Sequence, residues 1–166
     1  MTSSMSNVHF IGIDPGAKGA IATIYPDGTV TIIDMPTEDV VYCNTIISEV
    51  QSRFEGDGDY NNLVFMENVH ALPRQSTVAG FTFGKNVGKA ELYATSMLCY
   101  PSDKLIKVTP QKWKKFFNLT KDKKESILLA KELFPSITHL LTASKDGRAE
   151  ALLIAEYGRR NYDNYL

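Results

Sequence analysis

Two acidic residues stand where a carboxylate could do chemistry rather than face solvent. Asp14 ends the apolar run Val8–Ile13, and Glu67 ends the apolar run Leu63–Met66. A carboxylate directly after a buried strand is costly to desolvate unless it is paired or binds a cation. For Asp14, followed by Pro15-Gly16, two alternatives stay open: an aspartate that stabilises its own turn, or a phosphate-binding hairpin of a nucleotide-dependent fold.

Two further acids, Asp146 and Glu150, are four residues apart at the start of a predicted helix and share one side of it. Their mutual repulsion favours a compensating cation, although stabilisation of the positive end of the helix is an alternative. Four converging carboxylates suit Mg²⁺, a hard cation with oxygen ligands. Two such ions about 3.5–4 Å apart would activate a water and stabilise the leaving oxygen in phosphodiester hydrolysis. We therefore predict Asp14, Glu67, Asp146 and Glu150 as catalytic residues and metal ligands.

The elements that must position these acids form a predicted mixed α/β sheet, three antiparallel strands extended by two parallel ones and flanked by helices. The fourth strand can lie beside the first, which would bring Asp14 and Glu67 to neighbouring carboxyl ends, where α/β sheets place their sites. The strands are expected at Val8–Ile13, Ala20–Tyr25, Thr29–Ile33, Leu63–Met66 and Leu105–Val108.

Helices are expected at 38–54, about 82–100, from Thr109-Pro110 onward, at Lys123–Phe134 and at about 146–160. Thr109 is the expected N-cap and Pro110 the first helical residue. Residues 71–80 are interpreted as a loop leading into the helix from 82. In that helix, Gly84 and Gly88 are candidate close-packing points. Phe81 and Phe83 are interpreted as core residues in preference to wedges that enter nucleic acid.

Composition and length favour one globular domain over residues 1–166, with residues 1–7 flexible. The chain is 43% hydrophobic and 22% charged, and no apolar run approaches the roughly 20 residues that span a bilayer. The first residues lack the basic and apolar segments of a signal peptide, so a cytoplasmic protein is expected. Its two cysteines, Cys43 and Cys99, make neither a disulfide framework nor a cysteine-rich zinc site.

The net charge of −1 hides an uneven distribution. Residues 104–124 hold eight lysines and one acid, a charge of +7, and the rest of the chain carries −8. Such asymmetry can mark a phosphate-binding face beside an acidic centre, although a solvated helix face is an equal alternative. Trp113, Phe116 and Phe117 alternate with these lysines and are expected to anchor their helix to the sheet. His70, three residues after Glu67, could stack on a base or contact a phosphate.

Five segments together, spread over Phe10–Gly158, resemble the RuvC-type Holliday-junction resolvases of the RNase H-like superfamily, above all the shorter bacteriophage forms. The segments are Phe-Ile-Gly-Ile-Asp14-Pro-Gly, Met-Glu67-Asn-Val-His70, Phe-Thr-Phe-Gly-Lys-Asn-Val-Gly88, Val-Thr-Pro-Gln-Lys-Trp-Lys-Lys and Asp146-Gly-Arg-Ala-Glu150-Ala-Leu-Leu-Ile-Ala.

The resemblance implies a homodimeric endonuclease that nicks two strands symmetrically across a four-way DNA junction, with two Mg²⁺ ions for which Mn²⁺ substitutes. It carries the family's four-carboxylate site onto the same four acids. It places phosphate-holding lysines at Lys114 and at Lys123 or Lys124, and the dimer contact on the long helix after Phe83. No membrane and no organic cofactor is expected. The expected DNA-binding residues are His70, Arg74, Lys85, Lys112, Lys114, Lys123 and Lys124.

The sequence departs from the family's pattern at two places. Glu150 stands where many bacterial members have aspartate, four residues after the preceding acid instead of three, which makes Asp146 the least secure ligand. His70 stands where the bacterial family has a base-stacking aromatic residue, so sequence preference is expected to differ.

Two other classes of function compete with the nuclease. An actin-like or sugar-kinase-like ATP-dependent enzyme also opens with Gly-Ile-Asp-x-Gly, but 166 residues are too few for its two domains and no second phosphate loop is found. A DNA-binding accessory protein that has lost catalysis is disfavoured because all four acids are present.

Overall fold

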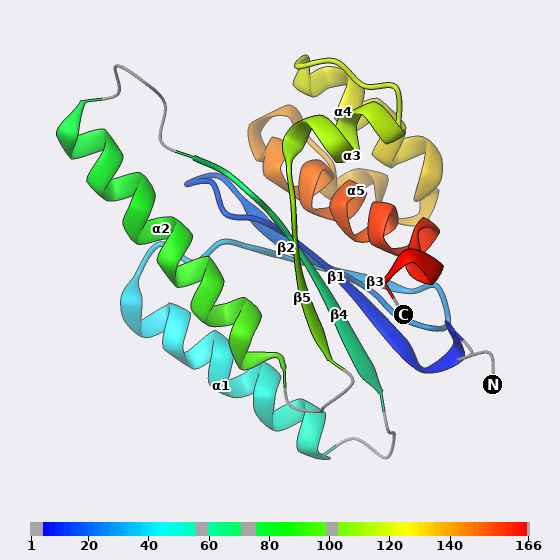
Figure 1. The fold of residues 1–166 in the computed structure, drawn as a ribbon, viewed down its shortest axis with the longest axis horizontal. Coiled ribbons are helices and arrows are strands. Elements are labelled where there is room, and N and C mark those ends of the chain that lie inside the picture. The colour runs from blue at the N-terminus through cyan, green and yellow to red at the C-terminus, as the bar shows by residue number, and fades with distance from the viewer. Residues whose placement is uncertain (1–4, 56–59, 71–75, 99–102, 166) are drawn as a thin grey trace.

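The computed structural model describes residues 5–55, 60–70, 76–98 and 103–165, and it contains the predicted five-stranded mixed sheet in the order β3-β2-β1-β4-β5 (Figure 1). β1, β2 and β3 are antiparallel, and β4 and β5 continue the sheet in parallel with β1. The strands are β1 (Val8–Asp14), β2 (Ala20–Ile24), β3 (Val30–Asp34), β4 (Asn61–Glu67) and β5 (Lys104–Val108).

Helices cover both faces of this sheet (Figure 1). α1 and α2 lie on one face, and α3, α4 and α5 lie on the other. The helices are α1 (Asp39–Glu55), α2 (Thr77–Ser96), α3 (Pro110–Phe116), α4 (Lys123–Leu133) and α5 (Asp146–Arg160), and the short 3₁₀ turns are η1 (Met5–Asn7), η2 (Pro135–Leu140), η3 (Ala143–Lys145) and η4 (Tyr162–Asn164). The predicted flexible start falls partly on η1 and partly on residues 1–4, which lie outside the described residues.

Strand register brings the two strand-end acids together. Ile13 pairs with Met66 in the parallel β1–β4 ladder, so the next residues along, Asp14 and Glu67, end neighbouring strands at the same edge. Glu67 in turn pairs with Val108 at the end of β5. The chain then passes directly into α3, which therefore starts beside Glu67.

Helix α5 is the centre of the layer that faces the site. The sequence predicts an amphipathic helix here, but residues 149–158 are buried throughout, because α4 covers the side of α5 that faces away from the sheet. A Cβ at Gly12 of β1 would lie 2.0 Å from the carbonyl oxygen of Ala151, so only glycine lets α5 lie this close to β1. This close approach carries Glu150 to the end of the sheet.

Helix α2 differs most from its prediction. It begins at Thr77 and not at about 82, because the Ser76 side chain caps it by accepting a hydrogen bond from Ala79 N. The core assignment of Phe81 is wrong, since 75% of this residue is exposed. A Cβ added at Gly84 or Gly88 would meet nothing within 4 Å, so these glycines are not close-packing points within the described chain.

The predictions for the start of α3, the end of α4 and the burial of Trp113 are confirmed. Thr109 caps α3 by accepting a hydrogen bond from Lys112 N, and Pro110 is its first residue. α4 ends directly before Phe134-Pro135. Trp113 is fully buried as expected, whereas Phe116 is 42% exposed and its ring contacts that of Tyr157 in α5, 5.3 Å between the ring centres. None of the described helices combines the length and the apolar character needed to cross a membrane.

Candidate active site

Asp14 ends β1 in a tight turn that orients its carboxylate. The residue is only 7% exposed, and its Oδ1 accepts a hydrogen bond of 3.0 Å from Gly16 N. A Cβ at Gly147, the second residue of α5, would lie 2.1 Å from the carbonyl oxygen of Lys18 and 3.0 Å from Asp14 Oδ2. The start of α5 therefore packs directly onto this turn, beside the free oxygen of Asp14.

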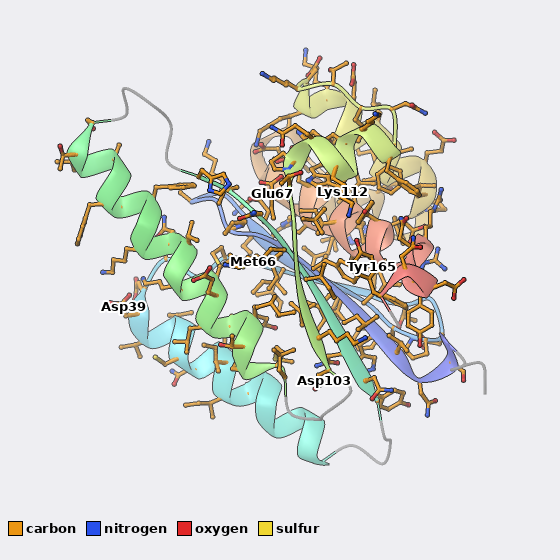
Figure 2. The ribbon with its side chains drawn as sticks, in the orientation of Figure 1. Asp39, Met66, Glu67, Asp103, Lys112 and Tyr165 are labelled. Atoms are coloured by element: carbon orange, nitrogen blue, oxygen red, sulfur yellow. The ribbon has the colours of Figure 1, made fainter. Side chains whose placement is uncertain are left out.

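Glu67 ends β4 beneath α3, at the same edge of the sheet (Figure 2). Its Oε1 accepts a hydrogen bond of 2.9 Å from the indole Nε1 of Trp113, which is wholly buried. The preceding residue, Met66, faces the other way and packs in the core beneath α2, as the alternation of a strand requires.

Two lysines neutralise the acids of α5. Lys114 Nζ lies 2.8 Å from Glu150 Oε1, and Lys123 Nζ lies 3.3 Å from Glu150 Oε2. Lys123 also forms an ion pair with Asp146 Oδ2. Glu150 is 6% exposed, so its charge is buried and needs these partners.

The charges of this cluster shift the pKa of its members. The pKa of Asp14 is raised to about 6, chiefly by burial, with the hydrogen bond from Gly16 opposing this rise and the charge of Glu150 adding to it. Burial raises the pKa of Glu67 to about 7, with the hydrogen bond from Trp113 opposing and the charges of Asp14 and Glu150 adding. Two acids whose pKa is raised toward neutral pH, mainly by burial, mark a candidate functional site.

A cavity of about 1080 Å³ opens over three of the four acids. Asp14, Glu67 and Glu150 line it, whereas Asp146 does not, which agrees with its standing as the least secure ligand. Phe83 of α2, which is half-buried, is one of the apolar residues that line it. Its basic lining residues are Lys18, Lys114, Lys115, Lys121 and Lys123.

The donor set suits a divalent cation, although the acids do not form a closed cluster. In the described part of the chain, no group of three or more His, Cys, Asp and Glu side chains is arranged as a metal site. The carboxylate oxygens point instead at Lys114, Lys123 and the Trp113 indole. Carboxylate oxygens from several elements are the donors that Mg²⁺ and Mn²⁺ bind. The residues present therefore fit the predicted ions.

The raised pKa values predict an unusual pH dependence of stability. Folded metal-free protein keeps protons on Asp14 and Glu67 that the unfolded chain has already released, so its free energy of unfolding should fall as the pH rises from about 5 to about 7. The shift of Asp14 alone corresponds to about 3 kcal/mol. Denaturant unfolding in EDTA measures this slope, which Asp14→Asn should flatten. The Asp34 carboxylate does not interfere, because the hydrogen bond from Arg148 lowers its pKa to about 2. A free energy that rises with pH across this window would contradict the prediction.

The predicted DNA-binding residues divide into four groups. Lys114 and Lys123 lie in the cavity wall, as just described. His70 follows β4 and is exposed, Lys124 is exposed at the start of α4, and Lys112 Nζ lies 5.9 Å from the ring centre of Tyr165. Lys85 lies on α2 and forms an ion pair of 3.7 Å with Asp39 of α1, on the far face of the sheet from Lys112 (Figure 2). Arg74 falls outside the described residues. The roles of all these residues in DNA binding stay predictions.

Sequence reasoning missed three features of the site and its surroundings. It placed Trp113 in the core but not at Glu67, and it did not find Lys18, whose hairpin bends back over the cavity. It also missed a clamp at the start of α5, where Arg148 Nε and Nη2 donate to the two oxygens of Asp34 at 2.6 and 2.9 Å. The pattern offers one signal for this clamp, an arginine between the two acids of α5 and an aspartate that ends an edge strand.

Comparison with solved structures agrees with this architecture. Over 92% of this chain and 94% of the other, the fold superposes on Thermus thermophilus RuvC in complex with a Holliday junction substrate, with a TM-score of 0.56 and 14% identity. The chain has the RuvC fold. Another Thermus thermophilus RuvC structure matches with a TM-score of 0.49 and 13% identity over 92% and 95% of the chains. The yeast mitochondrial Holliday junction resolvase Ydc2 matches with a TM-score of 0.45 and 17% identity over 98% and 87%.

Sequence comparison adds nothing to this assignment of the RuvC fold. No protein-family model matches the chain, and no curated protein matches it. The likeness to RuvC is therefore one of architecture, and the chemistry rests on the acids and lysines described above.

Proposed function

We propose that this protein is a metal-dependent, structure-selective endonuclease that resolves four-way DNA junctions by paired nicks. One observation carries the proposal: the carboxylates of Asp14, Glu67 and Glu150, from β1, β4 and α5, line a single cavity that five lysines also line. Carboxylates that gather divalent cations next to a phosphate-binding wall are what phosphodiester hydrolysis requires. The RuvC fold, seen with a Holliday junction substrate in Thermus thermophilus RuvC, makes branched DNA the substrate of choice.

The acids and the lysines that line the cavity have different roles in this reaction. Divalent ions held by Asp14, Glu67 and Glu150, with Asp146 as a fourth donor, would activate the attacking water and stabilise the leaving oxygen. Lys114 and Lys123 exchange their contacts with Glu150 for the scissile phosphate when DNA enters, because the incoming cations then neutralise the carboxylates. The other lysines of the wall hold the flanking phosphates.

The test is cleavage of an end-labelled immobile four-way junction, with a linear duplex of the same sequence as control, in Mg²⁺, in Mn²⁺ and in EDTA. We expect paired nicks near the junction centre with either metal, none in EDTA and none on the duplex. Binding without cleavage in both metals would show a non-catalytic DNA-binding protein, and absence of binding would overturn the proposal. A requirement for ATP would favour the kinase-like alternative.

Replacing Lys114 should weaken junction binding and its dependence on salt. Each phosphate contact contributes about 0.9 to the slope of log affinity against log salt concentration. Lys114→Ala should therefore flatten the slope by about 0.9, measured by fluorescence anisotropy at several salt concentrations with Mg²⁺ present and with a junction whose scissile phosphates are uncleavable analogues. Lys131→Ala, near the end of α4 and away from the cavity lining, is the matched control. A slope that Lys114→Ala leaves unchanged would place the DNA on another face.

We also propose that the protein works as a homodimer formed through α2. Val78, Phe81 and Leu92 of this helix are 77%, 75% and 56% exposed, a set of large apolar side chains that a monomer rarely leaves uncovered. Gly80, Gly84 and Gly88 recur every fourth residue of the same helix, and a Cβ at any of them would meet nothing within 4 Å. A second copy could therefore approach the α2 backbone closely.

The variant Gly84→Leu separates dimer formation from folding. A side chain at this open position should leave the monomer stable, and leucine favours helix by about 0.8–1 kcal/mol over glycine. The same side chain should keep a second copy from the backbone, so light scattering should show a monomer where the wild type is a dimer. Lys131→Ala again serves as control, and a wild-type chain that stays monomeric with junction DNA present would refute the dimer.

A further inference from the structure

The hydrogen bond between Trp113 and Glu67 joins the acidic end of β4 to the core. Trp113 is the only tryptophan of the chain, its exposed fraction is 0%, and its Nε1 lies 2.9 Å from Glu67 Oε1. An indole N–H is a donor and nothing else, so this contact fixes which oxygen of the carboxylate faces α3. Glu67 also lines the cavity, so the carboxylate that Trp113 holds belongs to the candidate metal site.

The donor is held rigidly relative to its acceptor. Glu67 and Val108 are partners in the β4–β5 ladder, and Asn68 N donates to Val108 O at 2.7 Å, one residue beyond. Thr109 then caps α3, whose first turn is fixed by Pro110, so only four residues separate the strand pair from Trp113. The indole is packed in the core cluster between the sheet and α5. Neither partner can move without disturbing the sheet edge.

The hydrogen bond from Trp113 to Glu67 differs from the contacts of Glu150, which are ion pairs with lysines. Glu150 is held by the ammonium groups of Lys114 and Lys123, which neutralise it and compete with any other cation for its oxygens. The indole carries no charge, so it orients Glu67 without neutralising the carboxylate. Lys114, whose Nζ lies 5.0 Å from the centre of the Trp113 ring, gains a cation–π contact from the same side chain. Trp113 and Lys114, consecutive residues of α3, thus contact acids of two different elements, Glu67 of β4 and Glu150 of α5.

We propose that Trp113 is a positioning residue, whose indole N–H presets the Glu67 carboxylate for a divalent cation before DNA binds. This inference deepens the proposed function and rests on its metal site. Partners behind a ligating carboxylate typically contribute 10–100-fold to metal affinity. The role requires the N–H group, and the aromatic ring alone does not suffice.

The test removes the N–H and keeps the ring. Benzothienylalanine, which carries sulfur in place of the indole N–H, is incorporated at position 113 in the full chain, and Trp113→Phe is the genetically simple companion. Mn²⁺ affinity is measured by calorimetry without DNA. We expect the dissociation constant to rise about tenfold or more in both proteins, with junction binding in EDTA unchanged. A benzothienylalanine protein that binds Mn²⁺ within twofold of the wild type would overturn the inference.

Two controls separate positioning from packing. Phe10→Leu shortens a buried side chain of the same core at the other end of β1, and it should lower stability without changing Mn²⁺ affinity. In a Glu67→Gln background, Trp113→Phe should weaken Mn²⁺ binding less than twofold, because the carboxylate it positions is gone. A full loss in that background would show that Trp113 acts by packing and overturn the inference.

The outcome for Trp113 is distinguishable from the outcome for the nuclease. A wild-type chain that cleaves junctions while both Trp113 variants bind Mn²⁺ normally would overturn the positioning role alone. A wild-type chain that binds Mn²⁺ more tightly than the variants but cleaves no DNA would leave the positioning role standing and overturn the nuclease.

Discussion

Asp14→Asn should lower junction cleavage by at least about a thousandfold while junction binding in EDTA persists. The side chain keeps its shape and can still accept the hydrogen bond from Gly16 N, so the turn should survive. What is lost is the negative charge of Asp14, on which cation binding depends. Single-turnover cleavage in Mg²⁺ measures the rate, and gel mobility in EDTA measures binding. Because the wild-type acid is destabilised by burial, the variant should also unfold at a higher denaturant concentration than metal-free wild type at pH 7.

The matched control for this variant is Asp163→Asn. Asp163 is exposed in η4 and is not among the residues that line the cavity, yet the substitution changes the net charge by the same amount. Cleavage by Asp163→Asn should equal that of the wild type. If Asp14→Asn retained more than about a tenth of the wild-type rate, the site would lie elsewhere on the molecule.

Lys123→Met should have opposite effects on metal binding and on catalysis. Lys123 pairs with Asp146 and lies 3.3 Å from Glu150, so it occupies the acids that a cation would otherwise use. Although burial lowers the pKa of Lys123, its hydrogen bond with Asp146 and the charge of Glu150 outweigh that effect and raise it, so the lysine stays charged. Its removal should tighten Mg²⁺ binding without DNA about tenfold, as measured by calorimetry. Cleavage should fall about a hundredfold because a contact with the scissile phosphate is lost.

Lys124→Met provides the control for the metal measurement. The neighbouring lysine is exposed and lies outside the cavity lining, so its removal changes the same overall charge without freeing an acid. Mg²⁺ affinity should change less than twofold in this variant. If Lys123→Met weakened Mg²⁺ binding instead, the lysine would be a support for the site and not a competitor.

The sequence was sufficient to predict the sheet and the meeting of Asp14 with Glu67. Apolar runs that end in acids, a hairpin with turn residues, and the need for helical crossovers between parallel strands leave few topologies. The helix ends of α3 and α4 were predictable for the same reason, since caps and prolines act through neighbours in the chain. Asp14 and Glu67 therefore followed from local patterns and one topological rule.

Contacts between distant segments could not be predicted in this way. The periodicity of Trp113 shows that it is buried, but not that its N–H reaches the end of β4. The apolar side chain of Phe81 favours a position in the core. Only the placement of α2 shows that one side of this helix is left uncovered within the described chain. The clamp between Asp34 and Arg148 joins residues 114 positions apart. Sequence pattern identifies which side chains need a partner, and the tertiary fold decides which partner they receive.

Because α5 packs closely on β1 at Gly12, the acidic site can assemble only once the whole chain has folded. α5 fills the core on one face of the sheet and also delivers Glu150, so the site cannot form before α5 docks. During synthesis, β1 and β4 emerge long before α5, and their acids remain apart from the rest of the site for that time. A nascent or partly unfolded chain would therefore lack the complete set of acids on which the proposed nuclease activity depends. Any damage that releases α5 would remove the assembled site together with the structure.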